Sequence, residues 1–226
     1  MTRILAVETA TDACSAALYI DGSVSELFEH APREHARLIL PMVRELLSQA
    51  HLPVTSLDAV AFGRGPGSFT GVRVAAGVVQ GIAFGAGLPV VPVSTLAALA
   101  QGVRREHGVF RVLAVLDARM EEVYWGAFAD PGTGHMAPVG EELVCLPTAV
   151  PLPGEGEWCG AGSGWERYGT ALRAQAGTRV TSVYQEHAPR ALDVALLAAD
   201  AYAAGRTVPP EQALPVYLRD RITKKA

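Results

Sequence analysis

The sequence is poor in cysteine, which argues against a protein built on disulfide bonds. Only three cysteines occur among its 226 residues, Cys14, Cys145 and Cys159, and no two of them form a CxxC pair. An odd and sparse set predicts free thiols in a reducing compartment. The N-terminus does not read as a signal peptide, because Glu8 follows only a short apolar run. We therefore expect a cytoplasmic protein that does not enter a membrane.

The sequence also lacks an excess of positive charge. Its 19 Lys and Arg residues against 23 Asp and Glu residues give a formal net charge of -4. Because binding to nucleic acid needs clustered positive charge, the chain is not expected to hold a phosphate backbone by itself. The tightest basic cluster lies at the C-terminus, where we interpret it as a solvated end: Arg219, Arg221, Lys224 and Lys225.

The motifs of common catalytic and metal sites are missing as well. The six histidines show neither HExxH nor HxxxH spacing, so a zinc site on one helix has no support. No Gly-Lys-[Ser/Thr] of a P-loop occurs, and Ser68 lies in Gly-Ser-Phe-Thr-Gly, which is not a nucleophile elbow. We therefore expect no catalytic residue and no metal ligand.

Half of the residues are hydrophobic, which is enough for a buried core, and their pattern predicts an α/β protein of two lobes. Residues 3–8, 13–20 and 23–28 form a predicted antiparallel meander with a hairpin turn at Asp21-Gly22. Helices and strands then alternate, which predicts a mixed β-sheet flanked by helices. The expected elements are helix 34–50, strand 58–62, helix 69–85, strand 89–93 and a helix from 95 to 101.

The second lobe is predicted as a shortened repeat of the first. We expect strands at 112–116, 123–128, 139–145 and 157–160, and a helix at 189–204. The first lobe is expected to comprise residues 1–104 and the smaller second lobe residues 105–189. The last helix and tail, about 190–226, are expected to pack back on the first lobe.

The glycine-rich turn at 63–73 is a candidate anion site. It lies between a predicted strand and a predicted helix, and the free N–H groups and dipole at a helix N-terminus attract anions. Spacing alone leaves a second interpretation open, in which the glycines serve only the backbone of a tight turn. The candidate phosphate-binding residues are Gly65, Gly67, Ser68, Thr70, Gly71 and Arg73.

Two helices carry candidate contact surfaces. Helix 34–50 has so wide an apolar stripe that we expect part of it to bind a protein. In helix 69–85, Gly77, Gly81 and Gly85 recur every four residues, which favours close packing inside the lobe and leaves the other face for a partner. The predicted interface residues are Glu34, His35, Leu38, Ile39, Met42, Val43, Leu46, Val74, Val78 and Ile82.

Five segments, taken in order, resemble the TsaB family, also called YeaZ. They are Ile4-Leu-Ala-Val-Glu-Thr-Ala-Thr-Asp12, Glu34-His-Ala-Arg-Leu-Ile-Leu-Pro-Met42, residues 63–73, Val90-Val-Pro-Val-Ser94 and Pro215-Val-Tyr-Leu-Arg219. The resemblance implies the actin-like ATPase fold, shared with sugar kinases and chaperone ATPases and related to RNase H. It also implies a role in making threonylcarbamoyladenosine next to the anticodon of tRNA.

In that family this subunit is not the catalyst. The resemblance implies that it scaffolds and activates its paralogue TsaD, that the ATPase TsaE joins them, and that ATP is used by the complex rather than by this chain. A homodimer is implied when the subunit is alone, and contact with tRNA is implied through the complex.

Alignment with TsaD places Thr95 and Leu99 where that paralogue has two metal-binding histidines, and neither residue can ligate such a metal. The turn at 160–164 resembles a reduced phosphate loop. Because glycine-rich turns occur in both lobes, a free-standing ATP-using enzyme of the same fold remains the alternative.

Overall fold

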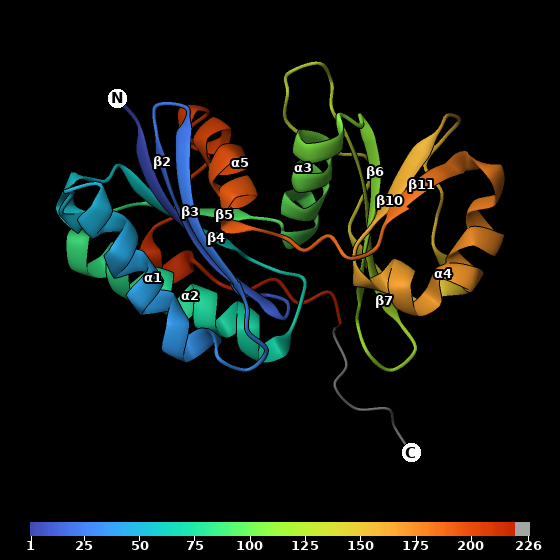
Figure 1. Cartoon of the computed structure of the whole chain (residues 1–226), viewed down its shortest axis with the longest axis horizontal. Coiled ribbons are helices and arrows are strands. Elements are labelled where there is room, and N and C mark those ends of the chain that lie inside the picture. Colours follow the sequence, from blue (N-terminus) through green and yellow to red (C-terminus); the bar gives the residue numbers. More distant parts are fainter. Residues whose placement is uncertain (220–226) are drawn as a thin grey trace.

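The computed structural model describes residues 1–219 and places them in two lobes, each built on its own sheet (Figure 1). The first sheet has the strand order β3-β2-β1-β4-β5. The second has the order β11-β10-β6-β7-β8, with β9 also paired to β7. Both sheets mix parallel and antiparallel pairs, as the sequence pattern predicts.

The first sheet confirms the predicted meander. Strand β1 (Arg3–Glu8) pairs antiparallel with β2 (Ala13–Ile20), which pairs antiparallel with β3 (Ser23–His30). On its other edge β1 pairs parallel with β4 (Ala59–Gly63), and β4 pairs parallel with β5 (Val90–Val93). This order, with β1 at the centre, is the one expected of the actin-like and RNase H-like fold.

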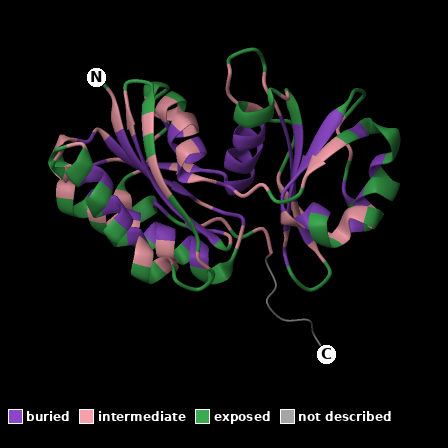
Figure 2. Ribbon diagram, viewed as in Figure 1, coloured by how far each residue is buried: buried purple, intermediate pink, exposed green. Residues whose placement is uncertain are grey.

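Helices cover both faces of the first sheet (Figure 1). Helices α1 (His35–Gln49) and α2 (Phe69–Ala86) pack on one face, where Ile39 and Leu46 join the same core as Phe62. Helix α5 (Ala191–Ala203) packs on the other face. The buried residues follow these contacts through the middle of each lobe (Figure 2).

Helix α3 (Thr95–His107) packs against the second sheet and also contacts α5, so it lies between the two sheets. Ser94 caps it as expected, accepting a hydrogen bond from the Ala97 N–H at 3.1 Å. The helix continues past its predicted end at 101, because the next residue that stops it is Gly108, with φ of 68°.

The second lobe departs further from its prediction. Strands β6 (Arg111–Asp117) and β7 (Val123–Ala129) form the expected hairpin. The predicted strand 139–145 is confirmed only at its end, where β9 (Leu143–Cys145) pairs with β7, and β8 (Ala137–Pro138) pairs with β7 just before the predicted range. After β10 (Trp158–Ala161), the sequence analysis also missed α4 (Ser163–Ala176) and β11 (Val180–Tyr184). Four 3-10 turns complete the described part: Val54–Ser56, Pro147–Ala149, Gly177–Arg179 and Pro210–Gln212.

Among the described residues, α2 is long and apolar enough to cross a membrane. A core helix passes the same test of length and composition. Here 33% of α2 is buried: Ala75, Val79 and Ala83 face the first sheet, while other apolar residues of the helix remain at the surface.

Candidate functional site

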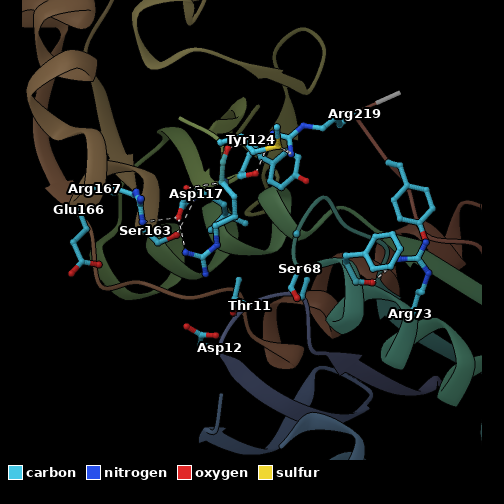
Figure 3. Close-up of a pocket in the computed structure, with 18 residues that line it drawn as sticks. Thr11, Asp12, Ser68, Arg73, Asp117, Tyr124, Ser163, Glu166, Arg167 and Arg219 are labelled. Atoms are coloured by element: carbon cyan, nitrogen blue, oxygen red, sulfur yellow. Dashed lines mark hydrogen bonds and ion pairs between the residues drawn. The ribbon is translucent and has the colours of Figure 1, made fainter. Parts of the chain in front are cut away.

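A cleft of about 1090 Å³ lies between the lobes (Figure 3). The first lobe contributes the loop after β1 and the start of α2, including the predicted residues Gly67, Ser68 and Arg73. The second lobe contributes the end of β6, the loop that follows it and the start of α4. The C-terminal segment adds Tyr217 and Arg219.

Several backbone groups at the N-terminus of α2 form hydrogen bonds within the protein. The Ser68 N–H donates to the Ala10 carbonyl at 2.7 Å, and the Ser68 hydroxyl accepts from the Gly71 N–H at 3.4 Å. The Thr9 hydroxyl donates to the Gly71 carbonyl at 2.8 Å. Because the loop after β1 bonds to this helix end, fewer N–H groups are left for an anion.

The glycines of the turn are explained by this close approach. A Cβ atom on Gly67 would lie 2.5 Å from the Ala10 carbonyl oxygen, and one on Gly71 would lie 2.0 Å from that of Thr9. Gly65 has φ of 99°, which favours glycine. The backbone interpretation of the turn therefore accounts for these three glycines without a ligand.

Arg73 stacks between two aromatic rings. Its guanidinium carbon lies 3.3 Å from the centre of the Phe69 ring and 4.8 Å from that of Tyr217, and its Nη1 donates to the Phe69 carbonyl at 2.8 Å. Such stacking stabilises a cation at a surface. Arg73 therefore fixes the C-terminal segment against α2, a role that the sequence analysis missed together with Tyr217.

The other arginines of the cleft pair with carboxylates, and Figure 3 shows Arg167 beside Asp117. Arg119 and Arg167 both approach the Asp117 carboxylate, at 3.2 and 3.5 Å. Arg219 pairs with Glu122 and donates to the Ala118 carbonyl at 3.1 Å. The expectation of a solvated basic end is therefore wrong for Arg219, which contacts the second lobe, while Arg221, Lys224 and Lys225 lie outside the described residues.

The turn at 160–164 is shaped by packing. A Cβ atom on Gly160 would lie 2.5 Å from the Trp165 ring, and one on Gly164 would lie 2.5 Å from Val115 Cγ1. Its glycines thus let α4 approach β6 closely. With Asp117 and Glu166 also lining this wall, the cleft offers little uncompensated positive charge for a polyphosphate.

The two positions aligned with the paralogue's histidines lie inside the protein. Thr95 is fully buried, where its hydroxyl donates to Glu8 Oε2 at 3.2 Å and accepts from the Gly65 N–H at 3.2 Å. Leu99 is fully buried against the second sheet. Burial raises the pKa of Glu8 to about 7, although hydrogen bonds from Ala10 and Thr95 act in the opposite direction.

Four of the predicted interface residues on α1 lie in the lobe's own core, which corrects their assignment. The exposed fractions of Ile39, Met42, Val43 and Leu46 are only 0%, 6%, 5% and 2%. Most of the apolar side chains of α1 that suggested a partner face therefore pack against the first sheet. These side chains are not available to a partner in this arrangement.

An apolar surface nevertheless remains on α1 and α2. Leu38, Val74, Val78 and Ile82 are half-buried and sit at the edge of the core, while Glu34 is exposed and pairs with Arg37. The sequence analysis missed Phe84, which is 81% exposed on α2. We call the α1–α2 face the surface formed by Leu38, Leu40, Val74, Val78, Ile82 and Phe84. His35 is half-buried, and its Nε2 has no hydrogen-bond partner among the described residues.

The glycines of α2 also extend this surface, contrary to prediction. Gly77, Gly81 and Gly85 are exposed, and a Cβ atom on any of them would meet nothing within 4 Å. They do not pack inside the lobe. Instead they leave a flat strip of helix beside Phe84, on which another chain could approach the backbone closely.

Comparison with known proteins gives consistent matches. Residues 27–157 match the family model described as TsaD, tRNA N6-adenosine threonylcarbamoyltransferase. The chain is 44% identical over 226 residues to the tRNA threonylcarbamoyladenosine biosynthesis protein TsaB of Escherichia coli (strain K12), covering 99% of this chain and 97% of that protein. It is 38% identical over 231 residues to the protein of the same name from Haemophilus influenzae, covering 98% and 95%. The solved structure of YeaZ from Pseudomonas aeruginosa superposes with a TM-score of 0.91 at 47% identity, covering 96% of this chain and 100% of that chain.

Proposed function

The chain belongs to the TsaB family of tRNA threonylcarbamoyladenosine biosynthesis proteins, and we propose that it acts there as a non-catalytic subunit that scaffolds and activates TsaD. The observation that carries the non-catalytic role is the pair of buried side chains at Thr95 and Leu99, where TsaD is expected to hold its metal. A threonine bonded to Glu8 and a leucine packed in the core leave no ligand at these positions.

The α1–α2 face is the surface that we assign to TsaD. The match to the TsaD family model spans residues 27–157 and so includes both helices, which means that TsaD should carry counterparts of them. A two-fold dimer uses the same patch on both copies, and a paralogue with the same helices can take the place of one copy. The same face would therefore form the homodimer of the chain alone and, when TsaD replaces one copy, the contact with TsaD.

The remaining components of the reaction are assigned to the partners. ATP is used by the complex, TsaE joins it, and tRNA is held mainly by the partner subunits, because the net charge of this chain is -4. The chain is expected to act in the cytoplasm, where tRNA is modified.

Replacing Phe84 by glutamate should abolish binding to TsaD and the modification of tRNA in a reconstituted mixture. A charge buried at the centre of an apolar interface is strongly unfavourable, and aromatic residues often dominate such interfaces. Size-exclusion chromatography with light scattering would report the complex, and incorporation of labelled threonine into tRNA would report activity.

Phe110→Glu is the matched control, since Phe110 is also an exposed phenylalanine, at 62%, but lies just before β6 of the second lobe. It should leave both binding and modification unchanged. If Phe84→Glu folds normally and still supports both, the α1–α2 face is not the contact with TsaD. If modification proceeds without this chain at all, the proposed function itself fails.

The interlobe cleft should not bind ATP tightly, because its arginines are held by aromatic rings and carboxylates. Isothermal titration of the purified chain with Mg-ATP should give no more heat than buffer. Saturable binding that is lost in Ser68→Trp, a substitution that fills the cleft, would instead favour the free-standing ATP-using enzyme.

A further inference from the structure

Away from the cleft, three side chains with metal-binding atoms meet at the end of α3. Glu106 and His107 are the last residues of that helix, and His187 lies in the connection between β11 and α5. One ligand atom from each lies within 4.8 Å of the others. Spacing along one helix could not reveal this cluster, because its ligands come from two distant segments of the chain.

The distances leave room for an ion between the side chains. His187 Nδ1 lies 3.7 Å from Glu106 Oε2, which is too long for a direct hydrogen bond. Ligands of a tetrahedral zinc ion, with bonds of 2.0–2.1 Å, lie about 3.3 Å apart. Glu106 is exposed, so its side chain can rotate toward that spacing.

The rings are held in place by the surrounding structure. His107 stacks on Tyr184 with ring centres 3.9 Å apart and planes inclined by 14°, and His187 meets His107 edge-on at 6.0 Å. The His187 N–H of the backbone donates to the Tyr184 carbonyl at 3.3 Å. The two histidines are therefore positioned by the end of β11 before any ion binds.

The second nitrogen of His187 is enclosed beside α3. His187 Nε2 is buried without a hydrogen-bond partner in the described residues. It and Asp193 Oδ2 would each lie 2.8 Å from a Cβ atom on Gly102, so both crowd the same side of α3. Because Nε2 is enclosed, Nδ1 is the nitrogen of His187 that faces Glu106 and can meet an ion.

The charges around the cluster are mixed. Arg105 is held by Asp193 at 2.9 and 3.1 Å, and Arg190 is held by Glu26 at 2.9 Å. Both arginines also reach one oxygen of Glu106, Arg105 at 2.9 Å and Arg190 at 3.8 Å, so a metal ion would have to bind through the other oxygen, the one nearest His187. The cluster also lies at the C-terminus of α3, where the helix dipole attracts positive charge.

We propose that Glu106, His107 and His187 bind a divalent transition-metal ion of the zinc type, with water as the fourth ligand. Two imidazoles and one carboxylate suit borderline metals rather than Mg²⁺ or Ca²⁺. The ion would join α3 to the segment that leads from β11 of the second lobe to α5, which packs on the first sheet. Its role would therefore be to fix the connection between the lobes.

Zinc binding by the full-length chain, without a histidine tag and stripped with a chelator, tests the proposal. Isothermal titration with ZnCl₂ should show one site per chain, and Co²⁺ should give the visible absorption bands of tetrahedral coordination. Zinc should also raise the melting temperature, because an ion that binds only the folded state stabilises it.

His107→Phe keeps a flat ring against Tyr184 but removes a ligand, so it should weaken zinc binding at least about tenfold without unfolding the chain. His187→Gln should do the same. His30→Phe, which changes an exposed histidine at the end of β3, should bind zinc as the unchanged chain does. If folded wild-type protein binds no zinc, or binds it equally well in all three variants, the site does not exist. Neither result would bear on the contact with TsaD.

Discussion

Replacing Gly71 by alanine should lower the free energy of unfolding by about 2 kcal/mol. A Cβ atom there would lie 2.0 Å from the Thr9 carbonyl oxygen and 3.0 Å from its carbon, and both are backbone atoms that cannot rotate away. Overpacking of this kind costs up to about 3 kcal/mol, which outweighs the gain of about 1 kcal/mol from placing alanine in a helix. For a chain of this size the melting temperature should fall by about 4–8 °C.

Gly77→Ala is the control, because it makes the same substitution in the same helix at an exposed position with nothing within 4 Å. It should raise the free energy of unfolding by up to about 1 kcal/mol. Urea denaturation followed by circular dichroism would measure both variants. Equal stabilities for Gly71→Ala and Gly77→Ala would mean that the Thr9 carbonyl does not lie in close contact with Gly71.

The first lobe could be predicted because its signals are local. Asp21-Gly22 marks the hairpin between β2 and β3, and Ser68 and Ser94 cap α2 and α3, although the end of α3 before Gly108 was placed too early, at 101. Each signal depends on the chemistry of one or two residues, so no knowledge of the tertiary structure is needed to read it.

The second lobe was harder because its elements are short and depend on packing. Strand β11, which was missed, has only five residues and gains its hydrogen bonds from β10, on the other side of helix α4 in the sequence. Helix α4 begins without a side-chain cap and contains Gly164 and Gly169, so its pattern resembles a turn. Periodicity could not reveal it.

Burial decides which of the predicted interface residues remain at the surface. An apolar stripe on a helix reads the same whether it faces a sheet or a partner, and only the structure shows that Ile39 and Met42 face the sheet. For the glycines of α2 the prediction was wrong in the opposite direction: their spacing suggested packing inside the lobe, but they are exposed. Phe84, the most exposed aromatic residue named on this face, lies directly beside Gly85.

Glu8→Gln should raise the free energy of unfolding at pH 8 by up to about 3 kcal/mol. Burial raises the pKa of Glu8 from 4.5 to about 7, and a difference of this size is worth about 3 kcal/mol at 1.36 kcal/mol per pH unit. The unfolded chain ionises first as pH rises, so Glu8 lowers stability progressively from about pH 4.5 to pH 7 and by its full amount above that. Glutamine resembles the protonated acid: its oxygen can accept from Ala10 and its amide can donate to Thr95.

The difference in unfolding free energy between Glu8→Gln and the unchanged chain reports on the Glu8 carboxylate, because the contributions of the other titrating residues are the same in both proteins and cancel. Asp193, whose pKa burial raises to about 6, adds a slope of the same sign in both proteins, so measurements between pH 6 and pH 8 report mainly on Glu8. Glu45→Gln, on the exposed side of α1, should keep the slope of the unchanged chain. If Glu8→Gln is less stable at pH 8 or retains the full slope, the buried carboxylate has a compensating partner. In that case its contact with Thr95, at the position where TsaD is expected to bind metal, would be a stabilising one.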